Sequence, residues 1–232
     1  MIEVKVIASG SGGNCTALIC GKVIILLDAG IGFDRIQRAL DFQNPTAALI
    51  THEHGDHAKI STVQELLKRG VEIFMTRGTA EALKLEKSHR LNLIEPVTRY
   101  QLEDLKFYAT PTIHDAAAPV MFSIGNAKFS LRYIVDSGEI PLQLAPTDYL
   151  LIETNYLETE LLNAKIDATQ KERISKNHLS FEKALRWINR NNFLDRFKEI
   201  HLMHISKRHG NGEKFRQVIK NLVGADTKVF AH

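Results

Sequence analysis

Short apolar runs alternate with glycine-containing turns along the first half of the chain. Ile2, Val4 and Val6 alternate with polar neighbours, which is the period of a half-buried strand, and they predict a strand over residues 2–9. Further apolar runs predict strands at residues 15–20, 23–27, 46–50, 71–74, 107–113, 120–125, 129–135, 149–152, 199–203 and 228–231.

Helical spacing of apolar residues interrupts the strands. Phe33, Ile36 and Leu40 recur at intervals of three and four and predict a helix over residues 33–41. The same spacing predicts helices at residues 60–69, 78–84, 157–164, 180–189 and 214–222. Strands followed by helices, in an order that occurs twice, indicate an α/β (α+β) fold with two sheets sandwiched by helices. We expect residues 1–232 to form a single domain.

Composition and charge fit a globular protein. The 232 residues are 44% hydrophobic and 25% charged, which suffices for a sizeable core. Cys15 and Cys20 lie five apart in one predicted strand, so their side chains point to opposite faces and form no local disulfide. The formal net charge of +3 suits an anionic substrate but does not identify one.

Targeting and membrane signals are absent from the sequence. No basic and then apolar segment opens the chain, and the most apolar run, at residues 23–27, is far too short to span a bilayer. Together with the two thiols, this pattern predicts a cytoplasmic protein that has no membrane contact. The sequence leaves open whether it is a monomer or a homodimer.

Three histidines and a carboxylate lie within six positions directly after an apolar run: His52, His54, Asp56 and His57. Residues two apart share a face at a strand end, so His52 and His54 should point the same way. We expect Asp56 and His57 to begin the following helix and to face a second point. Imidazole and carboxylate at this spacing are typical ligands of cations such as zinc and predict two neighbouring metal sites.

The histidine cluster alone supplies too few ligands for two metals. His114, Asp136 and His204 each follow a predicted strand, and a sheet brings the ends of such strands to one edge. Any one of the three could equally be a surface or capping residue. Together they complete two sites.

These residues, together with LDAG at 27–30, resemble the ordered motif set of the metallo-β-lactamase superfamily. Within it, the chain is more similar to the YycJ/WalJ-like group. The motifs that carry this similarity are ASGSGGN (8–14), THEH (51–54), HDAA (114–117), ETN (153–155), NHLS (177–180) and HISK (204–207). The similarity extends from about residue 4 to residue 212 and implies a four-layer αββα sandwich.

The resemblance implies a centre of two divalent metal ions, zinc or manganese. The implied ligands are His52, His54 and His114 for one metal, Asp56, His57 and His204 for the other, and Asp136 as the bridge. Asp28 is implied to accept a hydrogen bond from a ligand and to fix its orientation. Its alternative role is that of a turn residue before Gly30.

The resemblance extends to ribonuclease Z, in which a similar histidine-containing turn assists departure of the leaving oxygen. This implies His178 as general acid or phosphate stabiliser, Glu153 as the residue that orients it, and Asp56 as the candidate base. The alternatives are that His178 lies near a helix cap formed by Ser180, and that Glu153 is an exposed glutamate at a strand end.

Substrate contacts are harder to identify from the sequence. Arg173 and Lys207 lie within five positions of His178 or His204 and could contact phosphates, although a solvated charged face explains each one equally well. The loop at residues 10–14 lacks the Gly-Lys-Ser/Thr ending of a nucleotide-binding P-loop. The resemblance places it beside the metals, with Ser11 and Asn14 as candidate substrate contacts.

Hydrolysis of phosphodiester bonds in DNA or RNA is the leading hypothesis, and the resemblance implies exonuclease activity on DNA. A small-molecule or cyclic-nucleotide phosphodiesterase would use the same metals. A metal-binding regulatory partner without catalysis is the alternative from another class, and the complete ligand set argues against it.

Overall fold

The computed structural model describes residues 2–140, 145–190 and 194–232. They form two compact units. Unit 1 consists of the described residues up to Arg99 together with Ala109–Pro111 and Ala116–Val120. Unit 2 consists of Tyr100–Tyr108, Thr112–Asp115 and the described residues from Met121 to His232.

Unit 1 is built on a six-stranded sheet whose strands are neighbours in chain order, β1 to β6. Its elements are β1 (Ile2–Ala8), β2 (Cys15–Cys20), β3 (Val23–Leu27), α1 (Phe33–Ala39), β4 (Ala47–Leu49), α2 (Ile60–Lys68), β5 (Glu72–Thr76), α3 (Arg77–Ala82) and β6 (Leu91–Ile94). Strands β1 to β3 are antiparallel, and β3 to β6 are parallel. The carboxyl ends of β3, β4 and β5 therefore lie at one edge of the sheet.

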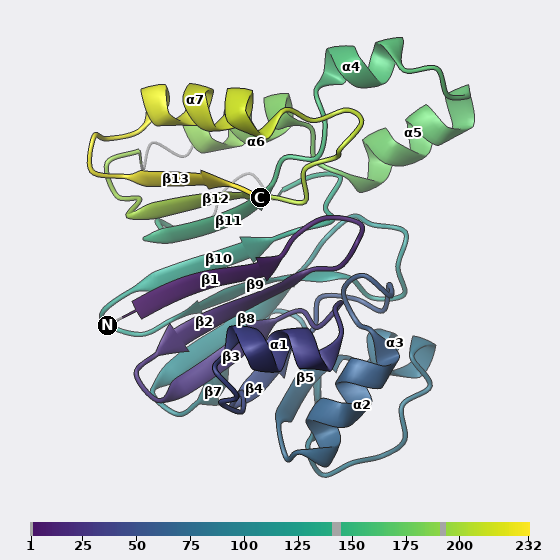
Figure 1. Ribbon diagram of the computed structural model, residues 1–232, viewed down its shortest axis with the longest axis vertical. Coiled ribbons are helices and arrows are strands. Elements are labelled where there is room, and N and C mark those ends of the chain that lie inside the picture. Colours follow the sequence, from purple (N-terminus) through teal and green to yellow (C-terminus); the bar gives the residue numbers. More distant parts are fainter. Residues whose placement is uncertain (1, 141–144, 191–193) are drawn as a thin grey trace. The chain divides into compact units, whose positions relative to one another are not determined.

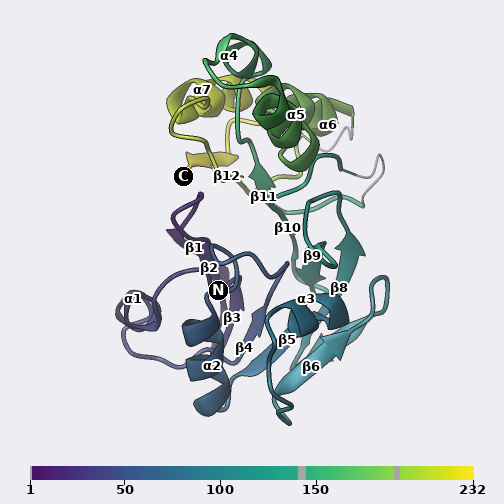
Figure 2. The same ribbon diagram turned by 90° about the vertical axis from the view of Figure 1, so that its right-hand side faces the viewer.

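Helices α1 and α2 lie on one face of this sheet (Figure 2). Ile36 of α1 and Leu66 of α2 are fully buried in a cluster with Ile24, Leu26 and Ile73 of the strands. The apolar spacing that predicted both helices is the spacing of the side chains that pack on the sheet.

Unit 2 is built on a seven-stranded sheet in the order β13-β12-β11-β10-β9-β8-β7. Its elements are β7 (Tyr100–Leu102), β8 (Leu105–Pro111), β9 (Val120–Gly125), β10 (Ser130–Ile134), β11 (Tyr149–Glu153), α4 (Glu158–Asn163), α5 (Ala168–Asn177), α6 (Phe181–Arg190), β12 (Glu199–Met203), α7 (Gly212–Leu222) and β13 (Lys228–Ala231). Strands β10 to β13 are parallel, so their carboxyl ends share an edge.

Helices α6 and α7 lie beside strands β11 to β13 (Figure 1). Phe181 of α6 and Phe215 of α7 stack with ring centroids 4.2 Å apart and are buried in a cluster that includes Ile152 and Leu202. This cluster supports the strands whose ends carry the polar residues described below.

The α/β class with two sheets is confirmed, and the expected strands and helices are present with shifts of a few residues at their ends. One placement was wrong. Asp56 and His57 do not begin a helix, because α2 starts at Ile60 and they lie in a turn that is closed by a hydrogen bond from the His57 amide to the His54 carbonyl (2.8 Å). Among the described residues, no helix has the length and apolar character that crossing a bilayer requires.

Candidate active-site residues

The predicted histidine cluster lies in unit 1, in the loop that leaves β4. Nε2 of His52 is 3.1 Å from Nδ1 of His54, and the ring centroids of His52 and His57 are 4.2 Å apart. His52 and His57 are buried, whereas His54 is half-buried. Three imidazoles therefore converge at the carboxyl edge of the parallel strands.

Asp28 organises this loop from the end of β3. Its Oδ1 accepts hydrogen bonds from the Thr51 amide (2.8 Å) and the Thr51 hydroxyl (2.9 Å), and its Oδ2 is 2.7 Å from Nδ1 of His57. The Thr51 hydroxyl donates its proton to Asp28, so it accepts from Nδ1 of His52 at 3.0 Å. Both rings then carry their proton on Nδ1 and the lone pair on Nε2.

The glycine-rich loop between β1 and β2 packs against the same turn. The Asn14 amide donates to the Asp56 carbonyl (2.6 Å), and its side-chain nitrogen is 2.9 Å from Nε2 of His57. A Cβ at Gly30 would lie 1.7 Å from the Asp56 carbonyl oxygen, so only glycine permits this approach. Asn14 is buried, whereas Ser11 at the tip of the loop is exposed.

The carboxyl edge of the unit 2 sheet carries a second cluster. Asp136 follows β10, Glu153 ends β11 and His204 follows β12, because parallel strands deliver their ends to one edge. His178, which ends α5, joins them, and one ligand atom from each of the four lies within 4.8 Å of the others. Asp136 and His204 have φ angles of 46° and 54°, in the left-handed region that few non-glycine residues occupy.

Glu153 and His178 form the closest pair in this cluster. Nδ1 of His178 donates to Oε1 of Glu153 at 2.7 Å, while Oε2 accepts from the Ser137 and Leu179 amides (3.0 and 3.1 Å). Burial lowers the pKa of His178, but the carboxylates of Glu153 and Asp136 outweigh it and raise that pKa to about 10. Burial favours neutral Glu153, yet its contacts with His178 and His204 hold the pKa of Glu153 below its ordinary value.

His114 extends the cluster from the residues after β8. Its Nδ1 donates to the Asn177 carbonyl (2.9 Å), and its Nε2 lies 3.6 Å from Asp136. Burial lowers the pKa of His114, and Asp136 only partly offsets that effect. His114 is therefore a neutral imidazole near neutral pH, which is the form that binds metals.

The imidazole and carboxylate groups of the two clusters are of the types that bind divalent metal ions. His52 and His57 in unit 1 and His114 in unit 2 have Nδ1 bonded to an oxygen acceptor, the arrangement that orients a metal-binding imidazole. Imidazole nitrogen and carboxylate oxygen suit zinc and manganese alike.

The two predicted phosphate contacts are exposed. Nε of Arg173 pairs with Asp115 at 2.9 Å, and the Arg173 side chain is 72% exposed. Lys207 is exposed in the loop after β12.

Two residues that position the candidates lie in the THEH and ETN motifs, but the sequence alone assigned them no role. Asn155 donates from Nδ2 towards Nδ1 of His204 and to the His204 carbonyl, both at 2.9 Å. It lies two positions after Glu153, and this period-two spacing was the available clue. Thr51 connects His52 to Asp28, and its place in the THEH motif does not indicate this hydroxyl contact.

The family model described as "Beta-lactamase superfamily domain" matches residues 24–205. The chain is 29% identical to the exodeoxyribonuclease WalJ of Streptococcus pneumoniae serotype 2 (strain D39) over 97% of this chain and 92% of that protein. The metallo-β-lactamase fold protein YhfI of Bacillus subtilis matches with a TM-score of 0.76 at 17% identity, covering 100% of this chain and 96% of that one. The short form of human tRNase Z matches with a TM-score of 0.64 at 18% identity, covering 88% and 93%.

Proposed function

The chain belongs to the beta-lactamase superfamily, and from this premise we propose that it is a metal-dependent phosphodiesterase that degrades DNA as an exonuclease. The observation that carries the proposal is the His178–Glu153 pair beside Asp136, because an imidazolium held by a buried carboxylate suits protonation of a leaving alkoxide. The exodeoxyribonuclease relative supports the choice of DNA.

Two divalent ions, zinc or manganese, are proposed as cofactors. Their ligands would be His52, His54 and His114 for one, Asp56, His57 and His204 for the other, and Asp136 for both. When bound, such ions supply Lewis acidity at the phosphate and acidify the attacking water. Asp28 would fix the His57 ring through the contact between its carboxylate and Nδ1.

The proposed roles of the side chains follow from the position of their protons. Asp56 would accept a proton from the attacking water, since its carboxylate is partly exposed and lies 3.7 Å from Nε2 of His57. His178 would donate from Nε2 to the leaving oxygen, because its Nδ1 proton is engaged by Glu153. Glu153 acts by holding the ring in place and keeping it protonated.

Arg173 and Lys207 are proposed to contact phosphates along the DNA strand, and their exposure is compatible with this role. Ser11 would touch the substrate from the tip of its loop. Asn14, whose side chain is occupied by backbone and ring contacts, would fix the shape of that loop.

We further propose that residues 1–232 act as one domain, as a monomer or homodimer, in the cytoplasm. Cys15 is a buried free thiol, which suits a reducing compartment. Size-exclusion chromatography with light scattering, and fractionation of cells that express the protein, test these points.

A substrate panel tests the proposal. Linear DNA labelled at either end, RNA, a cyclic nucleotide and bis-p-nitrophenyl phosphate should be compared with zinc and with manganese. We expect stepwise shortening of DNA from one end. Efficient turnover of the cyclic nucleotide without cleavage of either polymer would replace the nuclease assignment with that of a small-molecule phosphodiesterase.

A further inference from the structure

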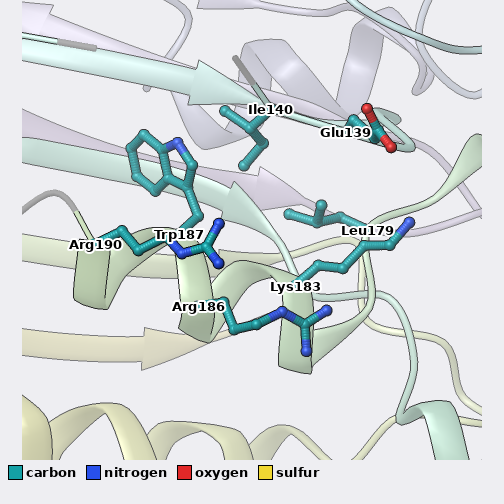
Figure 3. A pocket seen from close by; sticks show the side chains of 7 residues that line it. All are labelled: Glu139, Ile140, Leu179, Lys183, Arg186, Trp187 and Arg190. Carbon is teal, nitrogen blue, oxygen red and sulfur yellow. The ribbon is translucent and has the colours of Figure 1, made fainter. Parts of the chain in front are cut away.

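A pocket of about 330 Å³ lies along α6 in unit 2 (Figure 3). Its apolar lining comes from Ile140, Leu179 and Trp187, and its charged lining comes from Lys183, Arg186 and Arg190 of α6 together with Glu139. The volume is at the lower end of the range for small-ligand pockets. Three cations face one carboxylate, which leaves the lining positively charged.

The periodicity of α6 gathers these cations. Residues 183, 186, 187 and 190 follow the i, i+3, i+4, i+7 spacing of one helical face. Phe181, Ala184 and Ile188 are buried in the core, and Trp187 belongs to the same buried cluster while it also lines the pocket. The helix therefore presents an aliphatic and aromatic face to the sheet and a row of cations, with Trp187 between them, to the pocket.

The three cations differ in the hydrogen bonds and ion pairs that they make within the protein. Nζ of Lys183 donates to the Gly138 carbonyl (2.9 Å) and lies 3.5 Å from the Ser175 carbonyl, so this ammonium group already binds the backbone of two other segments. Among the residues that the structure describes, Arg186 pairs with Glu158 alone, at a long distance (3.4 Å), and its side chain is 55% exposed. Arg190 is exposed, and within the described ranges no carboxylate forms an ion pair with it. The two arginines are the groups available to an anion.

Part of the pocket lining is adjacent in sequence to the candidate catalytic residues. Leu179 directly follows His178, and its amide donates to Glu153. Glu139 and Ile140 follow Asp136 by three and four positions. A Cβ at Gly138 would lie 1.7 Å from the Lys176 carbonyl oxygen, which shows how closely this segment approaches the end of α5.

We propose that this pocket holds one nucleotide of a single DNA strand, namely the nucleotide next to the one that is cleaved off. This inference rests on the proposed function. Arg186 and Arg190 bind its phosphate, since guanidinium matches phosphate geometry. The base lies against Ile140, Leu179 and Trp187, which line the pocket, although Leu179 and Trp187 are otherwise buried in the core. A cationic rim beside an aromatic wall is the combination that binds single strands without sequence preference.

Trp187 provides a readout that does not depend on cleavage, because it is the only tryptophan in the chain. The metal-loaded protein is titrated with a phosphorothioate oligodeoxythymidylate, which resists hydrolysis, and tryptophan emission is followed. We expect a saturable change in emission. In the Arg186→Glu/Arg190→Glu variant the affinity should fall at least tenfold, and the salt slope should become shallower by about 0.7 per lost contact.

Arg38→Glu is the matched control, because Arg38 is an exposed helical arginine in unit 1 that does not line the pocket. This variant should bind like wild type. Both variants should hydrolyse bis-p-nitrophenyl phosphate within about twofold of wild type, since the small diester lacks a neighbouring nucleotide.

The outcomes separate the two proposals. If a labelled oligonucleotide binds while Trp187 emission and the affinity of the double variant stay unchanged, the pocket assignment is wrong and the nuclease proposal stands. If thymidine monophosphate binds as tightly as the strand, the pocket is a mononucleotide site and the strand assignment is wrong. If wild-type protein neither binds nor degrades DNA, the proposed function itself fails.

Discussion

Nδ1 of His178 lies 2.7 Å from Oε1 of Glu153, and the carboxylate that accepts this proton is fully buried. The same carboxylate receives the Ser137 and Leu179 amides on its other oxygen. Glu153 thus ties the residue after Asp136 to the residue after His178. Its geometry fixes the orientation of the His178 ring as well as its charge.

Removal of the imidazole separates chemistry from metal binding. His178→Ala should keep its metal content and lose about 10²- to 10⁴-fold in turnover of DNA, the range for a general acid. The loss should shrink for a p-nitrophenyl diester, whose leaving oxygen needs no proton. Equal losses on the two substrates would exclude proton donation by His178.

Glu153 should act only through His178. In Glu153→Gln a neutral amide replaces the carboxylate that accepts the Nδ1 proton of His178. We therefore expect turnover of DNA to fall about 10²-fold. The double variant with His178→Ala should be little worse than His178→Ala alone, because both changes remove one function. If the loss of kcat in the double variant equals the product of the two single losses, Glu153 has a role that is separate from His178.

Asp28 should control metal affinity through His57. Asp28 has a φ of 61°, a conformation that asparagine tolerates, so Asp28→Asn preserves the backbone while removing the charged acceptor of the His57 proton. We expect affinity for the metal to fall about 10- to 100-fold in a chelator competition. Asp34→Asn on α1 is the matched control, and equal affinities in both variants would contradict the orienting role.

A histidine pair at the end of the chain should make stability depend on pH. Nδ1 of His201 is 3.1 Å from Nε2 of His232, and burial lowers the pKa of both rings, that of His232 to about 4 from an ordinary value of 6.5. The unfolded chain therefore binds more protons between these values, so stability is lost as pH falls through this window.

Urea unfolding of the metal-loaded protein, above pH 7 and near pH 5, measures this dependence as the free energy of unfolding. His232→Asn removes one titrating ring and should lose less stability on acidification than wild type. Both proteins carry the same metals, so the metal contribution cancels when their losses in the free energy of unfolding are compared. An identical loss in both would show that His232 does not contribute.

The sequence predicted those elements whose apolar residues face a core. Helix α5 was missed because none of its residues is buried, so no apolar period marks it, although Asp167 caps it with a 2.8 Å bond to the Gln170 amide. Strands β6 and β7 were missed because they are short and half-exposed. Amphipathic periodicity cannot locate an element that packs few side chains.

The candidate residues could be predicted because they are histidines and carboxylates at the ends of apolar strands. Parallel strands bring such ends to one edge of a sheet. The placement of Asp136 and Glu153 in one cluster of unit 2 follows from that rule. The link from Asp28 through Thr51 to His52 depends on hydroxyl geometry that no spacing encodes. The pocket on α6 was missed because a row of arginines on a helix usually indicates only a solvated face.

The number of metals that activity requires tests the central claim most directly. Metal-free protein should be titrated with manganese and with zinc while degradation of end-labelled DNA and bound metal are measured together. We predict no cleavage without metal, a plateau at about two ions per chain, and loss of at least one bound ion in Asp136→Ala. Full activity at one ion per chain, or cleavage in the absence of metal, would contradict a dinuclear phosphodiesterase.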